Sequence, residues 1–197
     1  MLLCLLTRTL PCHAQSTNLQ FRHFEEGTPL NGNAIYITRQ DTDGYLWFGT
    51  YKGLYRYDGY NYKSFKDAKG DLKLLSQGPI EKMIIDHQNC IWALVNGVGL
   101  ICLDVKSGKV KKKFLVDDLG RKYGLNSILT DVEEDKDYNI WFSARGDGVF
   151  RWQASSDRLS QYTVIDSILF TKGRFESIIC DEGGNIWFGC LNFGLLF

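Results

Sequence analysis

The chain has 197 residues with 23 Lys and Arg against 23 Asp and Glu, so its net charge is zero and the basic surplus of a nucleic-acid-binding protein is absent. Hydrophobic residues make up 44% and aromatic residues 14%, which argues against disorder and is enough for the core of one domain. With 20 Gly, only 3 Pro and no apolar run of about 18 residues, the sequence favours many short strands and excludes an ordinary membrane-spanning helix.

The first fifteen residues resemble the end of a secretory signal. An apolar run at 2–6 is followed by the small residue Ala14, as before a signal cleavage site. Arg8 follows the apolar run, whereas a complete signal carries its positive charge ahead of that run. We therefore expect residues 1–15 to be a signal remnant, with the true start upstream, and the protein to be exported.

Residues 19–24 predict a single strand, and four similar segments follow it. Four tryptophans lie 45, 49 and 46 residues apart, at Trp47, Trp92, Trp141 and Trp187. Six residues before each of them is an aspartate: Asp41, Asp86, Asp135 and Asp181. Six or seven residues after each is a glycine followed by an aliphatic residue: Gly53, Gly99, Gly148 and Gly194. Aligned columns in four copies indicate a structural repeat.

The first copy predicts four strands, at 34–40, 45–50, 54–57 and 62–65. Asp-Gly pairs at 43–44 and 58–59 predict tight turns between them, because glycine adopts positive φ at little cost. No segment of comparable length shows a sustained helical period. Four short antiparallel strands in about 45 residues are typical of one β-propeller blade.

We therefore predict an all-β fold, with β-propeller repeats over residues 16–197. The expected blades are four-stranded antiparallel sheets at 33–66, 78–115, 127–163 and 173–197, the last without its outer strand. Two architectures follow from this pattern. Either residues 19–24 close a small four-bladed ring, or the chain is the first arc of a larger ring, which we favour.

The first copy resembles a known family in several short motifs. These are Phe21-Arg22-His23-Phe24, Asn33-x-Ile35, and the run from Gln40 to Gly59 with Leu46-Trp47-x-Gly49-Thr50 and Gly53-Leu54-x-Arg56-Tyr57. They are similar to the two-component regulator propeller repeats. The second copy departs most, because Ala93-Leu94-Val95 replaces the Phe-Gly-Thr of the first.

The resemblance implies the periplasmic sensor region of a hybrid two-component histidine kinase of the Bacteroidetes type. Such regions hold propellers of about seven blades, often in tandem, followed by an immunoglobulin-like domain, a membrane helix and a kinase core, and they respond to oligosaccharides. The chain is then an N-terminal fragment that performs no catalysis and needs no cofactor or metal. Its expected partners are a glycan bound through the full-length receptor and either the remaining blades or a second protomer, with no nucleic acid and no membrane span.

Two other functions stay open from the sequence. A secreted propeller enzyme, such as a lyase, would need His, Arg or carboxylate groups that converge at one face of the ring, and the chain has only 3 His. A non-functional truncated gene product fits the weak start and the abrupt end of the sequence.

Candidate ligand contacts come from a tyrosine-rich stretch, Tyr51 to Tyr62. Aromatic rings suit glycans, and Tyr51 and Tyr60 are the best candidates because they fall in predicted loops. The other tyrosines are expected to pack in the sheet. The lysine-rich run 106–113 fits either an acidic glycan or, as we favour, an outer strand that lysines protect from edge pairing.

Other residue patterns predict no catalytic or metal site. Asp41-x-Asp43-Gly44 begins like a calcium loop, but the later ligands are missing, so a side-chain bond within the turn is favoured. The cysteines form no C-x-x-C pair and are expected to be buried, although Cys180 and Cys190 on one hairpin are candidates for a disulfide. The histidines are scattered, and adjacent carboxylates such as Glu133 and Glu134 point to opposite faces of a strand.

Overall fold

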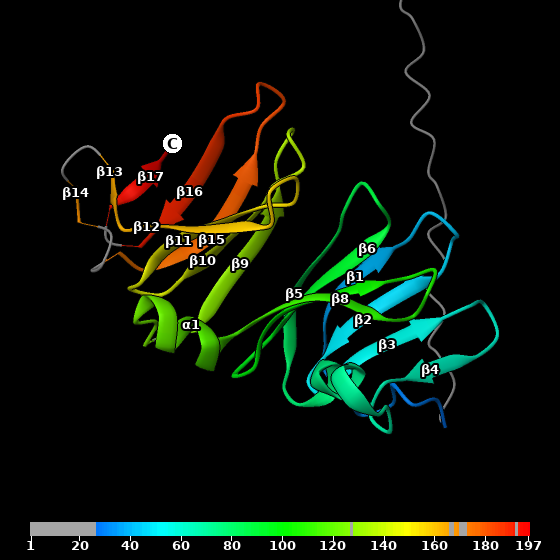
Figure 1. Ribbon diagram of the computed structural model, residues 1–197. Coiled ribbons are helices and arrows are strands. Elements are labelled where there is room, and N and C mark those ends of the chain that lie inside the picture. The colour runs from blue at the N-terminus through cyan, green and yellow to red at the C-terminus, as the bar shows by residue number, and fades with distance from the viewer. Residues whose placement is uncertain (1–26, 127, 166–167, 170–172, 192) are drawn as a thin grey trace, which may run out of the picture.

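The four predicted repeats form four antiparallel sheets, arranged as the successive blades of an open arc (Figure 1). The computed structural model describes residues 27–126, 128–165, 168–169, 173–191 and 193–197. The expected signal remnant and the predicted strand 19–24 lie outside these residues.

Each blade is a meander in which consecutive strands pair. Blade 1 holds β1 (Ile35–Gln40), β2 (Leu46–Thr50), β3 (Gly53–Tyr57) and β4 (Tyr62–Ser64). Blade 2 holds β5 (Ile80–Ile85), β6 (Cys90–Val95), β7 (Gly99–Asp104) and β8 (Val110–Leu115). Blade 3 holds β9 (Leu129–Glu134), β10 (Ile140–Ala144), β11 (Gly148–Gln153) and β12 (Arg158–Tyr162). Blade 4 holds β15 (Phe175–Cys180), β16 (Ile186–Cys190) and β17 (Gly194–Leu196), and a short hairpin of β13 (Val164–Ile165) and β14 (Ile168–Leu169) precedes it. The all-β propeller prediction, with an incomplete last blade, is confirmed.

In the described part of the chain, two short helices connect blades, and the sequence analysis missed both. The 3-10 helix η1 (Gly70–Ser76) joins blades 1 and 2, and α1 (Val116–Tyr123) joins blades 2 and 3. Helix α1 buries Leu119 against the core and ends at Gly124, whose φ of 72° lets its N–H bond to the Gly120 carbonyl. A helix of about two turns is too short to establish a helical period in the sequence.

The aspartate of each repeat binds the tryptophan six residues later. The indole N–H donates to the carboxylate Oδ2 at 2.6 Å in blade 1, 2.9 Å in blade 2, 2.7 Å in blade 3 and 2.8 Å in blade 4. The other oxygen accepts the backbone N–H four residues on, at 2.8–2.9 Å in all four copies. The predicted hydrogen bond within the turn is therefore present. The bond to the indole adds to it and explains why an aspartate and a tryptophan recur together in every repeat.

One position in each of these turns has positive φ. It is occupied by Gly44 (88°), Asn89 (59°), Tyr138 (63°) and Gly184 (88°). Glycine and asparagine tolerate this conformation, whereas a bulky side chain disfavours it. Tyr138 is therefore the exception among the four turns.

Neighbouring blades pack face to face through the aliphatic residue that follows the repeat glycine. Leu54, Leu100 and Val149 are at most 1% exposed and lie in apolar clusters with residues of the next blade. Their counterpart in blade 4, Leu195, is 66% exposed. Within the part of the chain that the structure describes, blade 1 does not cover blade 4, so these residues form an open arc and not a closed four-bladed ring.

The disulfide candidate is wrong. Cys180 and Cys190 are free, and the hairpin register pairs Cys180 with Ile186 but Cys190 with Phe175, at opposite ends of the two strands. Cys90, Cys102 and Cys190 are buried, as expected for small apolar side chains. Among the described residues, no helix is long and apolar enough to cross a membrane.

Candidate functional site

A pocket of about 360 Å³ lies between blades 2 and 3, at the end of the sheets where the aspartate turns are. Its volume is within the range of small-molecule sites. Its floor consists of buried side chains from β6, β7 and β10: Cys90, Trp92, Cys102 and Ile140. Its walls and mouth are formed by His87, Gln88, Lys111, Lys112, Glu134, Tyr138, Trp152, Ala154 and Asp157, beside the turn aspartate Asp86.

Blade 2 differs from the other blades at two repeat positions above its tryptophan. Two residues before the tryptophan, the four copies have Tyr45, Cys90, Asn139 and Asn185. Three residues after the repeat glycine, they have Arg56, Cys102, Arg151 and Phe197. In blades 1 and 3 the arginine lies over the indole of its own blade, at 5.9 Å and 5.4 Å, and in blade 4 the phenylalanine ring lies 4.9 Å from it. In blade 2 the small side chains of Cys90 and Cys102 take these positions, so the space over the Trp92 indole stays open.

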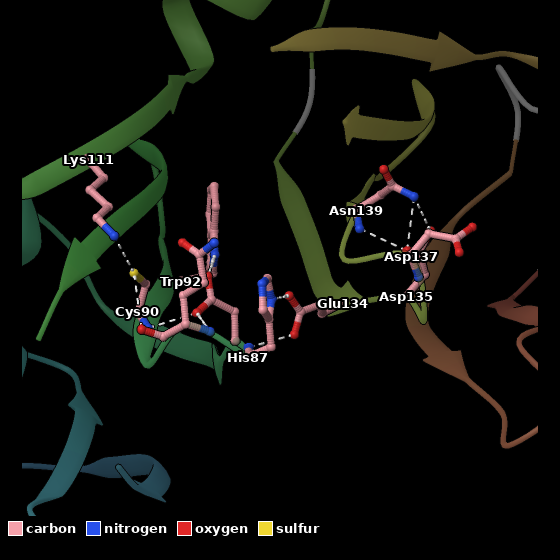
Figure 2. A network of polar contacts seen from close by, with 10 residues as sticks. His87, Cys90, Trp92, Lys111, Glu134, Asp135, Asp137 and Asn139 are labelled. Carbon is pink, nitrogen blue, oxygen red and sulfur yellow. Dashed lines mark hydrogen bonds and ion pairs between the residues drawn. The ribbon is translucent and has the colours of Figure 1, made fainter. Parts of the chain in front are cut away.

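A histidine and a glutamate join the two blades at the pocket mouth. His87 Nδ1 lies 2.6 Å from Glu134 Oε1, and the His87 backbone N–H donates to Glu134 Oε2 at 2.9 Å (Figure 2). The His87 ring also stacks on Tyr138, with 3.8 Å between ring centroids. The sequence analysis took His87 as isolated, because only the stacking of blades brings these residues together across 47 positions.

Two lysines of β8 line the other side of the pocket. Lys111 Nζ lies 3.0 Å from Asp104 Oδ2 and donates to Cys90 Sγ at 3.3 Å (Figure 2). The backbone N–H of Ser107 and then the Lys111 ammonium lower the pKa of Asp104 to about 2. Lys112 pairs with Asp157 of blade 3 and lies 5.5 Å from the Trp152 ring. Residues 110–113 of the lysine-rich run thus lie on the outer strand β8, as we favoured, whereas 106–109 form the turn before it, and Lys111 and Lys112 also line the pocket.

Three potential metal ligands meet on the pocket floor. The ligand atoms of Asp86, Cys90 and Cys102 all lie within 4.8 Å of one another. The sequence analysis missed this group because the cysteines are twelve residues apart. Burial raises the pKa of both thiols, and the Lys111 ammonium beside Cys90 opposes a cation. Three donors are also one short of a closed tetrahedral zinc site.

The predicted ligand contacts Tyr51 and Tyr60 are exposed by 61% and 91%. Tyr51 follows β2, in the turn to β3, whereas Tyr60 lies in the turn from β3 to β4. These turns are at opposite ends of the same sheet, so the two residues do not form one site. Neither of them lines the pocket between blades 2 and 3.

A second, polar hollow of about 540 Å³ follows the inner strands β1, β5, β9 and β15. Arg39, Lys82, Asp131 and Glu133 line it. Burial, and then the Asp131 carboxylate, raises the pKa of Glu133. The hollow contains fewer aromatic side chains than the pocket, so the pocket is the stronger candidate for small-molecule binding.

Solved structures of β-propellers share this fold. The extracellular domain of BT3049, described as a hybrid two component system of B. thetaiotaomicron, aligns at 23% identity with a TM-score of 0.64, over 89% of this chain and 23% of that domain. The extracellular domain of BT4673, described as a one component system of B. thetaiotaomicron, aligns at 19% identity with a TM-score of 0.61, over 82% and 21%. A streptogramin B lyase aligns at 17% identity with a TM-score of 0.59, over 83% and 53%. The chain thus spans less than a quarter of the two Bacteroides domains.

No curated protein sequence matches the chain. Residues 29–52 match the family described as "Two component regulator propeller". This segment contains β1, the Asp41 turn and β2, which form the inner hairpin of blade 1. Residues 29–52 are therefore similar to the two component regulator propeller repeat that the sequence motifs resembled.

Proposed function

We propose that the chain is the ligand-sensing propeller portion of a periplasmic two-component sensor and performs no catalysis itself. The observation that carries this proposal is the two component regulator propeller match in blade 1. The fold shared with the extracellular domains from B. thetaiotaomicron supports it. A propeller arc with an uncovered last blade is also suited to be one part of a larger receptor.

The proposed ligand is an oligosaccharide, bound as part of the full-length receptor. Remaining blades, or a second protomer, would cover the exposed face of blade 4. The pocket between blades 2 and 3 supports small-molecule binding, because aromatic rings and several polar groups converge on one open cavity.

A propeller lyase is the second candidate, and the contact between His87 and Glu134 favours it. A carboxylate that orients a histidine is a common arrangement for a general base. The family match in blade 1, however, favours a sensor.

Glycan binding by the full chain tests the proposed function. We expect oligosaccharides released from polysaccharides to raise the melting temperature and to give saturable heats in calorimetry, because a ligand of the native state stabilises it by mass action. Mass spectrometry of the recovered glycans checks for turnover. Cleavage that His87→Ala abolishes would establish the lyase instead, and binding of no glycan would refute the proposal that this arc itself contacts the glycan.

A further inference from the structure

Tyr138 lies at the pocket mouth in a backbone conformation that its side chain disfavours. Its φ is 63°, and the same turn position holds glycine in blades 1 and 4 and asparagine in blade 2. A glycine here would make the turn more favourable, since a residue with a Cβ is strained at positive φ. Strain of this kind is concentrated at functional sites.

The hydrophobic core does not account for this tyrosine. Its side chain is 53% exposed and belongs to none of the buried clusters in the described part of the chain. Its ring stacks on His87 of blade 2 and faces the pocket that both residues line. The side chain is thus placed where a bound molecule would touch it.

The charges around the pocket favour an uncharged ligand. Three carboxylates, from Asp86, Glu134 and Asp157, exceed the two ammonium groups of Lys111 and Lys112. Lys112 already pairs with Asp157, and Lys111 pairs with Asp104. An acidic ligand would therefore meet a small excess of negative charge, whereas hydroxyl groups can donate to the carboxylates and accept from the lysines.

We propose that this pocket binds a neutral saccharide of one or two rings, with Tyr138 as an aromatic contact. The C–H face of the sugar would lie against the Tyr138 and Trp152 rings, and its hydroxyls would bond to His87, Gln88 and Glu134. The inference rests on the proposed sensing of oligosaccharides. It assigns saccharide binding to this pocket, which Tyr51 and Tyr60 do not line.

The test compares Tyr138→Gly with Tyr138→Phe in the full chain. The probes are the neutral disaccharides cellobiose, maltose, lactose and xylobiose, with a glucuronic-acid-containing disaccharide as the acidic arm. For at least one neutral probe, we expect Tyr138→Gly to weaken binding at least tenfold while raising the melting temperature. Tyr138→Phe should retain binding, because it keeps the ring. Tyr51→Ala and Tyr60→Ala are matched controls, expected to bind as the natural chain does.

Other outcomes separate this inference from the proposed function. If the natural chain and Tyr138→Gly bind equally, or if a control variant loses binding, this pocket is not the saccharide site. The proposed sensor function would not be affected by either result. If only the acidic disaccharide binds, the proposal of a neutral ligand is wrong. Failure of every disaccharide would overturn the inference, and the larger glycans of the preceding experiment then decide the proposed function separately.

Discussion

A single carboxylate, that of Asp41, fixes the inner hairpin of blade 1 through three hydrogen bonds. It accepts the backbone N–H groups of Asp43 and Tyr45 at 3.0 and 2.9 Å and the indole N–H of Trp47 at 2.6 Å, and it is only 5% exposed. We expect Asp41→Ala to lower the free energy of unfolding by about 2–4 kcal/mol, because buried donors lose a charged acceptor. Urea unfolding measures this loss. Asp43→Ala, at an exposed position of the same turn, should cost less than about 0.5 kcal/mol, and equal losses would refute the argument.

We expect Asp181 to make the stability of the protein dependent on pH. The indole N–H of Trp187 and then the side chain of Asn185 lower its pKa to about 2, from an ordinary value of 3.8. A lowered native pKa means that the stabilisation is complete above the unfolded pKa and is lost as the pH falls from about 4 toward 2.

The measurement is urea unfolding followed by tryptophan fluorescence at several pH values between 2 and 5. Asp181→Asn keeps an acceptor oxygen but cannot titrate, so its stability should fall less steeply with acid. If the variant and the natural chain have the same slope over this range, Asp181 does not contribute to the pH dependence.

At the residue scale, the sequence revealed the turn aspartates but not the pocket. A column of Asp before a Gly or Asn predicts a turn bond from local chemistry alone. The pairing of His87 with Glu134 depends instead on how blades 2 and 3 stack, and no local pattern encodes it. One sequence feature could have indicated the pocket: in copy 2, cysteines occupy two repeat positions that hold larger residues in the other copies.

In blades 2 and 3 the repeat glycine marks the close approach of the outer strand to the third strand, whereas in blade 1 Gly53 lies against the backbone of η1. A Cβ at Gly148 would lie 2.3 Å from the Tyr162 carbonyl oxygen, whereas a Cβ at Gly194 would have nothing within 4 Å. Both glycines have positive φ, 86° and 76°, so alanine is strained by a similar amount at either position.

We therefore expect the two alanine variants to differ because of the clash alone. Gly194→Ala should cost about 1–2 kcal/mol. Gly148→Ala should cost about 3 kcal/mol or more, because the β12 backbone has to shift. Thermal and urea unfolding measure both, and equal costs would mean that β12 moves away freely.

At the level of elements, the strands and tight turns followed from the repeated Asp, Trp and Gly positions and from the Asp-Gly pairs. The sequence did not predict the bulge in every inner strand. Examples are the bulges in β1 between Ile35 and Ile37 and in β5 between Ile80 and Lys82. The two helices that join blades were also missed. Both features depend on how a strand curves or docks on its neighbour, and the sequence pattern of a single element does not contain that information.

At the scale of the molecule, the exposed face of blade 4 is the largest departure from the repeat. Leu195 is 66% exposed, while its counterparts Leu54, Leu100 and Val149 are at most 1% exposed under the next blade. Ile179 and Phe197 of the same blade are 60% and 77% exposed. Exposed apolar patches of this kind drive association, so we expect the isolated chain to self-associate as its concentration rises.

Sedimentation velocity over a range of concentrations, with Leu195→Lys as the variant, tests this expectation. The charge at an already exposed position should shift the protein toward monomer and leave the folded circular dichroism spectrum unchanged. Leu54→Lys is the matched control, because the same change at a buried copy of the position should unfold the protein by placing a charge in the interface between blades. A natural chain that stays monomeric at all concentrations would show that another segment covers Leu195, and blade 4 would then not be the docking face of the arc.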